Sequence, residues 1–136
     1  QGSALQEKMA GNSRDSEQAF LAAEAALRNG ESFIVTTSEG DFTSSGTEGL
    51  YDVTGSDALP VDWKSSSTQW RDGNSLGSFT AATPEFYIEK LPEVTNKGLS
   101  LAADQPLETM IIYRVTARAV GITDTSQAVL QSTFRR

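Results

Sequence analysis

The sequence predicts an α+β fold in which one long N-terminal helix packs on an antiparallel β-sheet, with a long glycine-rich loop region between them. Residues 3–29 are dominated by strong helix formers and contain almost no Gly or Pro. Residues 113–119 alternate apolar and polar side chains, which is typical of a strand with one buried face. Six glycines among many Ser and Thr residues between positions 38 and 83 indicate loops. With 136 residues, we expect a single domain, 1–136.

The N-terminal helix is expected to span residues 3–29. Ser3 and Gln6 have the spacing of a capping box at its start. Asn29-Gly30 is a suitable stop, because Gly readily adopts the left-handed conformation that follows many helices. Gly11 and Asn12 weaken the middle of the helix.

This helix has two apolar sides of different kinds at 100° per residue. The side with large residues is expected to form the core between helix and sheet, and it comprises Leu5, Met9, Phe20, Ala23 and Leu27. The roughly opposite side carries Leu21, Ala22 and Ala25. These three residues form a second contact face for a partner helix, unless the alanines are there only because they favour helix.

The region 30–83 is expected to hold one strand followed by a long loop. Residues 32–37 are rich in β-branched side chains and predict a strand. Residues 50–53 are a short strand or a turn. Long loops in compact domains are often functional.

The region 84–136 is expected to form antiparallel strands that end in a hairpin. Residues 84–91 form a strand closed by Pro92, and residues 108–120 give the strongest strand pattern. A turn near Gly121 leads to a last strand at 126–134, which should pair with 108–120. The sheet residues expected in the core are Tyr113, Val115, Leu130 and Phe134.

The residue types present exclude much chemistry. The chain contains no His and no Cys, so no Ser-His-Asp or Cys-His triad and no ordinary zinc site can be built. The net charge of −7 argues against nucleic-acid binding by this domain. We expect no enzyme activity and no cofactor. The carboxylates of Asp52, Asp57 and Asp62 are more simply explained as solvated loop acids than as a carboxylate-only catalytic pair.

Two ligand interpretations stay open at this point. Glu39, Asp41 and Glu48 could supply oxygen ligands to calcium, although their spacing is not that of an EF-hand, or they could be simple solvent-facing charges. Trp63 and Trp70 could stack on a sugar or anchor a partner, or could form a small cluster under the loop.

The chain begins at Gln1 without Met, and we expect a processed product or a fragment. No apolar run approaches the ~20 residues of a membrane span, so we expect either a cytosolic protein or a targeting segment upstream of Gln1.

Two stretches are more specific than these general patterns. One runs from Leu5 to Asp15 and continues from Ala19 to Arg28. The other combines residues 113–118 with residues 128–136. Together they resemble the PilX family of type IV pilus minor pilins, and the resemblance covers both ends of the chain.

The resemblance implies a pilin-like fold and a structural role. Such proteins carry an apolar N-terminal half-helix that anchors them in the inner membrane, with the domain in the periplasm, until they enter the pilus at the cell surface. That half-helix is missing here. The resemblance implies that the protein joins other minor pilins in a priming complex that starts pilus assembly, with a place at the pilus tip beside a large adhesin of the PilY type. Such pili, or fimbriae, serve cell adhesion, twitching motility and DNA uptake.

Two alternatives remain beside the minor pilin. One is a pseudopilin of a type II secretion system, which shares the architecture. The other is a surface carbohydrate- or protein-binding module that uses Trp63 and Trp70.

Overall fold

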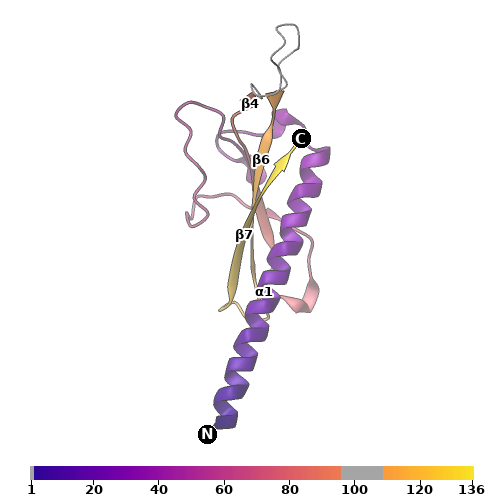
Figure 1. The fold of residues 1–136 in the computed structure, drawn as a ribbon, viewed down its shortest axis with the longest axis vertical. Coiled ribbons are helices and arrows are strands. Elements are labelled where there is room, and N and C mark those ends of the chain that lie inside the picture. Colours follow the sequence, from indigo (N-terminus) through magenta and orange to yellow (C-terminus); the bar gives the residue numbers. More distant parts are fainter. Residues whose placement is uncertain (1, 96–108) are drawn as a thin grey trace.

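The computed structural model describes residues 2–95 and 109–136, and it shows one long helix lying along one face of a β-sheet (Figure 1). Helix α1 spans Gly2–Thr36. The strands are β1 (Leu50–Asp52), β2 (Arg71–Asp72), β3 (Glu85–Lys90), β4 (Val94–Thr95), β5 (Thr109–Met110), β6 (Ile112–Val120) and β7 (Gln127–Arg135). Three short 3₁₀ turns, Glu39–Asp41, Thr47–Gly49 and Gly77–Phe79, interrupt the loops. The predicted α+β class is confirmed.

The main sheet has the strand order β1-β3-β6-β7, and β2 also pairs with β3. Strand β6 is antiparallel to both of its neighbours, β3 and β7, as expected. Strand β1 runs parallel to β3, so the sheet is mixed rather than purely antiparallel. Strands β4 and β5 form a separate two-stranded ladder. The predicted strand 108–120 corresponds to β5 and β6, except that Glu108 lies outside the described residues.

The expected end of the helix at Asn29-Gly30 and the expected strand at 32–37 are both wrong, because α1 continues through both to Thr36. Gly30 is a packing residue here rather than a cap. A Cβ atom added at Gly30 would lie 2.5 Å from Val115 Cγ1, so only glycine lets the helix approach the sheet this closely. Ile34 is fully buried one turn later. Packing against the sheet thus overrides the β-branched composition of this segment.

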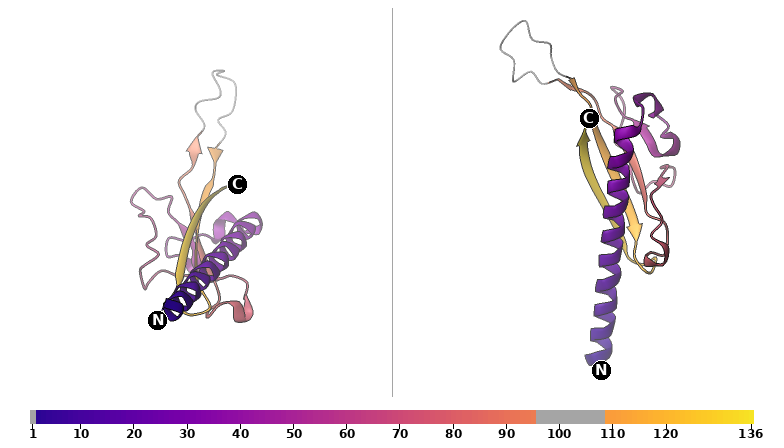
Figure 2. Two further views of the ribbon diagram at one scale, coloured as in Figure 1. Left: turned by 60° about the horizontal axis from the view of Figure 1, so that its bottom comes forward. Right: turned by 90° about the vertical axis from the view of Figure 1, so that its right-hand side faces the viewer.

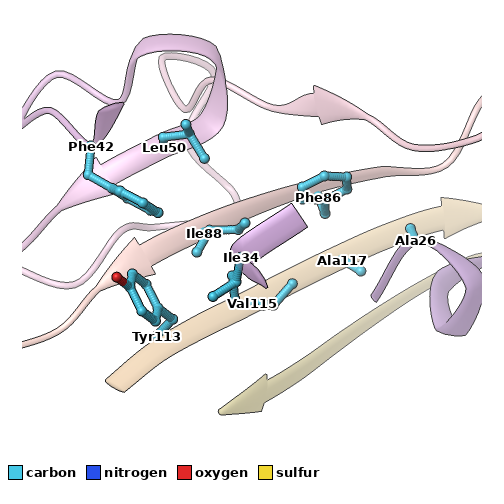
Figure 3. Close-up of a cluster of buried hydrophobic side chains, with 9 residues drawn as sticks. All are labelled: Ala26, Ile34, Phe42, Leu50, Phe86, Ile88, Tyr113, Val115 and Ala117. Atoms are coloured by element: carbon cyan, nitrogen blue, oxygen red, sulfur yellow. The ribbon is translucent and has the colours of Figure 1, made fainter. Parts of the chain in front are cut away.

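The main core lies between α1 and the sheet. Figure 3 shows its buried side chains, with Ala26 and Ile34 from α1 facing residues of β3 and β6. The nine members of this cluster are Ala26, Ile34, Phe42, Leu50, Phe86, Ile88, Tyr113, Val115 and Ala117. A second, smaller cluster around Ala22, Ala23 and Ala119 continues the core toward the hairpin end of the sheet.

Candidate interaction surface

Helix α1 has a packed part and a projecting part. Asp15 is its first buried residue, and the described residues before it are all exposed. The early turns extend past the end of the sheet (Figures 1 and 2). Leu5 is 61% exposed and Met9 is 63% exposed. Nothing among residues 2–95 and 109–136 buries these two apolar side chains, so this part of the helix is a candidate contact surface.

The packed part of α1 meets the sheet through small residues. Its sheet-facing side follows helical spacing and consists of Asp15, Ala19, Ala22, Ala23, Ala26, Gly30 and Ile34. Alanine and glycine hold the helix axis close to the sheet. This stripe of small residues is therefore the core side of the helix.

Three of the residues expected in the helix–sheet core are exposed, and that expectation is wrong for them. Leu5 and Met9 lie on the projecting part, and Phe20 lies beside the buried stripe and is 45% exposed. Leu5 and Met9 are exposed because the sheet ends before it reaches them, and Phe20 lies outside the buried side of the helix, which consists mainly of small residues. The other helix residues of the set are placed inward, with Ala23 fully buried and Leu27 packed against the main core.

The sheet residues expected in the core all face α1. Tyr113 and Val115 are fully buried in β6. Leu130 and Phe134 of β7 are partly buried and pack against the two core clusters. Their alternation along the strand put these side chains on one face, and the register of β6 with β7 brings Tyr113 opposite Phe134.

The three residues expected on a partner-contact face are separated by the structure. Ala22 is 1% exposed and packs beside Ala119, so it is not a contact residue. Leu21 is 49% exposed, and Ala25 is half-buried. Val35, which the sequence reasoning had placed in a strand, is 62% exposed on the same helix.

Asp15 fixes the place where the helix leaves the sheet, and the sequence reasoning missed this residue. Its Oδ1 accepts a hydrogen bond from the Thr123 backbone N–H at 3.0 Å, and its Oδ2 accepts one from the Thr123 hydroxyl. Thr123 belongs to the turn between β6 and β7. These hydrogen bonds hold the pKa of the Asp15 carboxyl below its ordinary value. The sequence signal that could have identified Asp15 is an acidic residue on an otherwise apolar side of the helix.

A buried ion pair holds the loop region against the other face of the sheet. Glu89 is fully buried, and Arg114 donates to it with Nε at 2.9 Å and a terminal nitrogen at 2.7 Å. The hydrogen bond to Glu89 raises the pKa of Arg114. The Val61 N–H also donates to Glu89, at 3.1 Å, which ties the loop to β3.

The acids considered for calcium are distributed among separate contacts. Glu39 pairs with Lys90 at 3.5 Å and Glu48 pairs with Arg71 at 3.1 Å. Asp41 accepts a hydrogen bond from the Ser38 N–H at 3.2 Å. Within residues 2–95 and 109–136, no three potential metal ligands of the His, Cys, Asp and Glu types gather at one point.

The two tryptophans occupy different environments. Trp70 lies edge-on to Tyr87, with ring centres 4.7 Å apart, and the Arg118 guanidinium stacks on it at 3.9 Å. Trp63 is half-buried, with the Lys64 ammonium 5.5 Å from its ring centre. A hollow of about 500 Å³ beside Tyr51 and Asp62 has neither tryptophan among its lining residues in the described part of the chain. Trp70 therefore belongs to the packing under the loop.

These features define a class: an α+β protein of pilin-like architecture, with a long helix that projects from one end of a sheet domain. A family model described as "Type IV pilus assembly protein PilX C-term" matches residues 11–136. The chain belongs to this family and is a type IV pilus-related minor pilin. No curated protein and no solved structure matches the chain.

Membership carries two further statements. The family is a structural component of pili, and it implies contact with other pilus components.

In the part of the chain that the structure covers, no helix is both long and apolar enough to cross a membrane.

Proposed function

We propose that this chain helps to start type IV pilus assembly together with other minor pilins, and that it sits at the pilus tip with a PilY-type adhesin. The description of the family as an assembly protein supports the first part. The single observation that carries the proposal is the projecting part of α1, with Leu5 and Met9 exposed on it. A structural protein needs a surface for its neighbours, and this helix offers one.

The proposed contact surface is an apolar stripe on α1. Leu5, Met9 and Phe20 form this stripe on one flank of the helix, whereas Leu21 and Ala25 lie on the roughly opposite side and offer a separate, smaller contact. Covering a large apolar side chain completely is worth about 1.5–3 kcal/mol. Several such residues along one helix therefore give a neighbouring pilin helix enough apolar surface for a specific contact.

We place the domain in the periplasm, anchored in the inner membrane by an apolar helical segment that precedes Gln1, before its transfer to the pilus. The direction of α1 supports this placement, because its first described turns point away from the sheet (Figure 2). A segment continuing that helix would meet a membrane without touching the sheet.

The proposal is tested in the full-length gene in a strain that depends on it for pili. Leu5→Lys with Met9→Lys should abolish or strongly reduce surface pili and twitching, because charged side chains would replace the apolar stripe. The matched control is Gln6→Lys, which adds a charge to the same projecting turns without removing an apolar side chain. Normal piliation in the Leu5/Met9 variant, with unchanged thermal unfolding of the purified domain, would overturn the contact surface.

The position at the tip and the pseudopilin alternative are tested separately. Immunogold labelling should place the protein at pilus ends, and label along the whole shaft would contradict the tip placement. Deletion of the gene should remove pili and leave type II secretion intact. Loss of secretion with normal pili would assign the chain to the secretion system instead.

A further inference from the structure

Strand β7 forms a long free edge of the sheet. It spans nine residues, Gln127–Arg135, and its register pairs all nine with β6. In the strand order β1-β3-β6-β7 it is the terminal strand, with no other strand beside it in the described residues. Figure 1 shows β7 lying alongside α1 at this side of the sheet. An uncovered strand edge is a template for another chain.

The outward backbone groups of β7 can be assigned from the ladder. The Gly121 N–H donates to the Ser126 carbonyl, and the Arg136 N–H donates to the Ile111 carbonyl. In an antiparallel pair, residues that bond across the ladder alternate with residues that point away. The even-numbered residues of β7 therefore bond to β6. The outward N–H and C=O groups belong to Gln127, Val129, Gln131, Thr133 and Arg135.

Strand β7 lacks the features that usually keep an edge strand from pairing with another chain. Natural edge strands are short, bulged, or carry Pro or Lys. Strand β7 contains no Pro, Gly or Lys, and its one charged residue, Arg135, is at its end. At the opposite side of the sheet, β1 has only three residues and β2 only two. The unprotected edge is thus also the long one.

One flank of helix α1 borders the β7 edge. The Ser132 hydroxyl donates to Glu31 at 2.9 Å, which places this flank of the helix over β7. Phe20, Glu24, Leu27 and Glu31 follow the spacing of one helix flank. Phe20 is 45% exposed, and Leu27 is partly buried against the core. Side chains of an added strand that faced α1 would cover these apolar residues.

The acidic residues on this helix flank determine which kind of strand fits beside β7. Glu24 and Glu31 lie on the flank, and neither takes part in an ion pair among the described residues. A strand with apolar residues and a Lys or Arg facing α1 fits them. A second copy fits poorly, because each chain carries a net charge of −7. The helix-facing residues of β7 itself, Ala128, Leu130, Ser132 and Phe134, include no cation.

We propose that the outer edge of β7 is the docking site for an extended strand of another pilus component, which alternates polar residues with apolar and basic residues facing α1. The added strand pairs its backbone with the odd-numbered residues of β7, and alternate side chains rest on the helix flank. This proposal rests on membership of the pilus assembly family, and its site shares only Phe20 with the apolar stripe of the proposed function.

The test uses the full-length protein in piliated cells. p-Benzoylphenylalanine in place of Thr133 should cross-link to one pilus component, identified by mass spectrometry. The same probe in place of Ser66, an exposed loop residue, is the position control. Gln131→Pro removes an outward N–H without removing a backbone hydrogen bond to β6, although the Gln131 side-chain hydrogen bond to Thr116 is lost, and it should reduce the Thr133 cross-link by about tenfold. Gln131→Thr keeps the strand and should preserve the cross-link.

A second variant guards against misfolding. Gln131→Lys keeps the backbone N–H and adds a charge at the edge, and it should reduce the cross-link while its thermal unfolding matches that of Gln131→Thr, which loses the same side-chain hydrogen bond to Thr116. An unchanged cross-link in both edge variants, or no cross-link to a pilus component, would overturn the proposal. A cross-link only to a second copy would also overturn it.

Failure of this proposal can be told apart from failure of the proposed function. If the edge variants assemble and cross-link normally while Leu5→Lys with Met9→Lys blocks assembly, strand docking alone is wrong. If the Leu5/Met9 variant makes normal pili while the edge variants lose their cross-link, the helix stripe alone is wrong.

Discussion

The two parts of α1 have similar helix-forming sequences and opposite environments. Leu5 and Ala23 lie on the same side of the helix, because about five turns separate them. Leu5 is 61% exposed, whereas Ala23 is fully buried. The difference arises because the sheet accompanies only the part of the helix from Asp15 onward. Burial on this helix is decided by where the sheet ends, and not by which side chain is more apolar.

The comparison separates two roles within one element. The packed part carries alanine, glycine and one isoleucine toward the sheet and stabilises the domain. The projecting part keeps its large apolar residues exposed and contributes little to the domain's own core. Substitutions in the two parts should therefore affect different properties.

The largest stability effect is expected at Ile34. Ile34→Ala removes a fully buried side chain and should lower the free energy of unfolding by about 2–5 kcal/mol. Val35→Ala is the matched control, because Val35 is the next residue and is 62% exposed. Urea denaturation of both variants measures the difference. Equal losses would contradict the assignment of Ile34 to the core.

Two of the helix glycines, Gly11 and Gly30, should respond in opposite directions to substitution by alanine. Gly30→Ala introduces a Cβ that would meet Val115, and overpacking of this kind costs about 1–3 kcal/mol. Gly11→Ala has no neighbouring atom within 4 Å and should gain about 0.5–1 kcal/mol from helix propensity. Thermal unfolding followed by circular dichroism reports both changes. A stabilised Gly30→Ala variant would show that the helix can move away from the sheet.

The packing of α1 at Asp15, where its projecting part meets its packed part, should lose stability in acid. The lowered pKa of Asp15 means that its ionised form stabilises the folded state above the ordinary pKa of 3.8. That contribution is lost as the pH falls through the lower pKa of the folded state. Asp15→Asn should therefore unfold more easily at neutral pH and lose less stability on acidification than the parent.

Denaturant midpoints at about pH 6 and about pH 2.5 measure this effect. Thr123→Ala should reproduce part of it, because the Thr123 N–H still donates to Asp15. Asp52, whose pKa is lowered by its hydrogen bond from the Thr54 hydroxyl, retains its own acid response in both variants. An identical acid response in the parent and Asp15→Asn would exclude Asp15 as a contributor.

The smallest stability effect is expected on the projecting part. Leu5→Ala and Met9→Ala should change the free energy of unfolding by less than about 0.5 kcal/mol, because both side chains are exposed. The same two variants should weaken pilus assembly. A clear loss of stability in either one would mean that the projecting turns fold back onto the domain.

The elements with strong local patterns could be predicted from the sequence, and those set by packing could not. The alternation from Tyr113 to Ala119 predicts a strand whose odd-numbered residues face the helix, as β6 does. The local sequence around Gly30 predicts the end of a helix, whereas its contact with Val115 depends on a residue far along the chain. The parallel pairing of β1 with β3 depends on a similarly distant partner.

The candidate site shows the same limit. Helical spacing grouped Leu5, Met9 and Phe20 on one flank correctly, but spacing alone does not say where the sheet stops. Side-chain size favoured the large side for the core, whereas the buried side of the helix consists mainly of small residues. Ala22 was assigned to the wrong side for this reason. The free edge of β7 follows from the strand order, which the sequence does not encode locally.

The clamp between Asp15 and Thr123 has a mechanical consequence. A pulling force on the N-terminal end of α1 acts along the helix axis, and the sheet lies beside that axis (Figure 1). The load then reaches the domain in shear, through every contact from Asp15 to Ile34, instead of peeling them apart one by one. Asp15 is in the first packed turn of α1, which would bear the force first. Its hydrogen bonds to the β6–β7 turn hold this helical turn against the sheet. A pull along α1 would thus load these contacts together, along the same helix that carries the proposed contact surface.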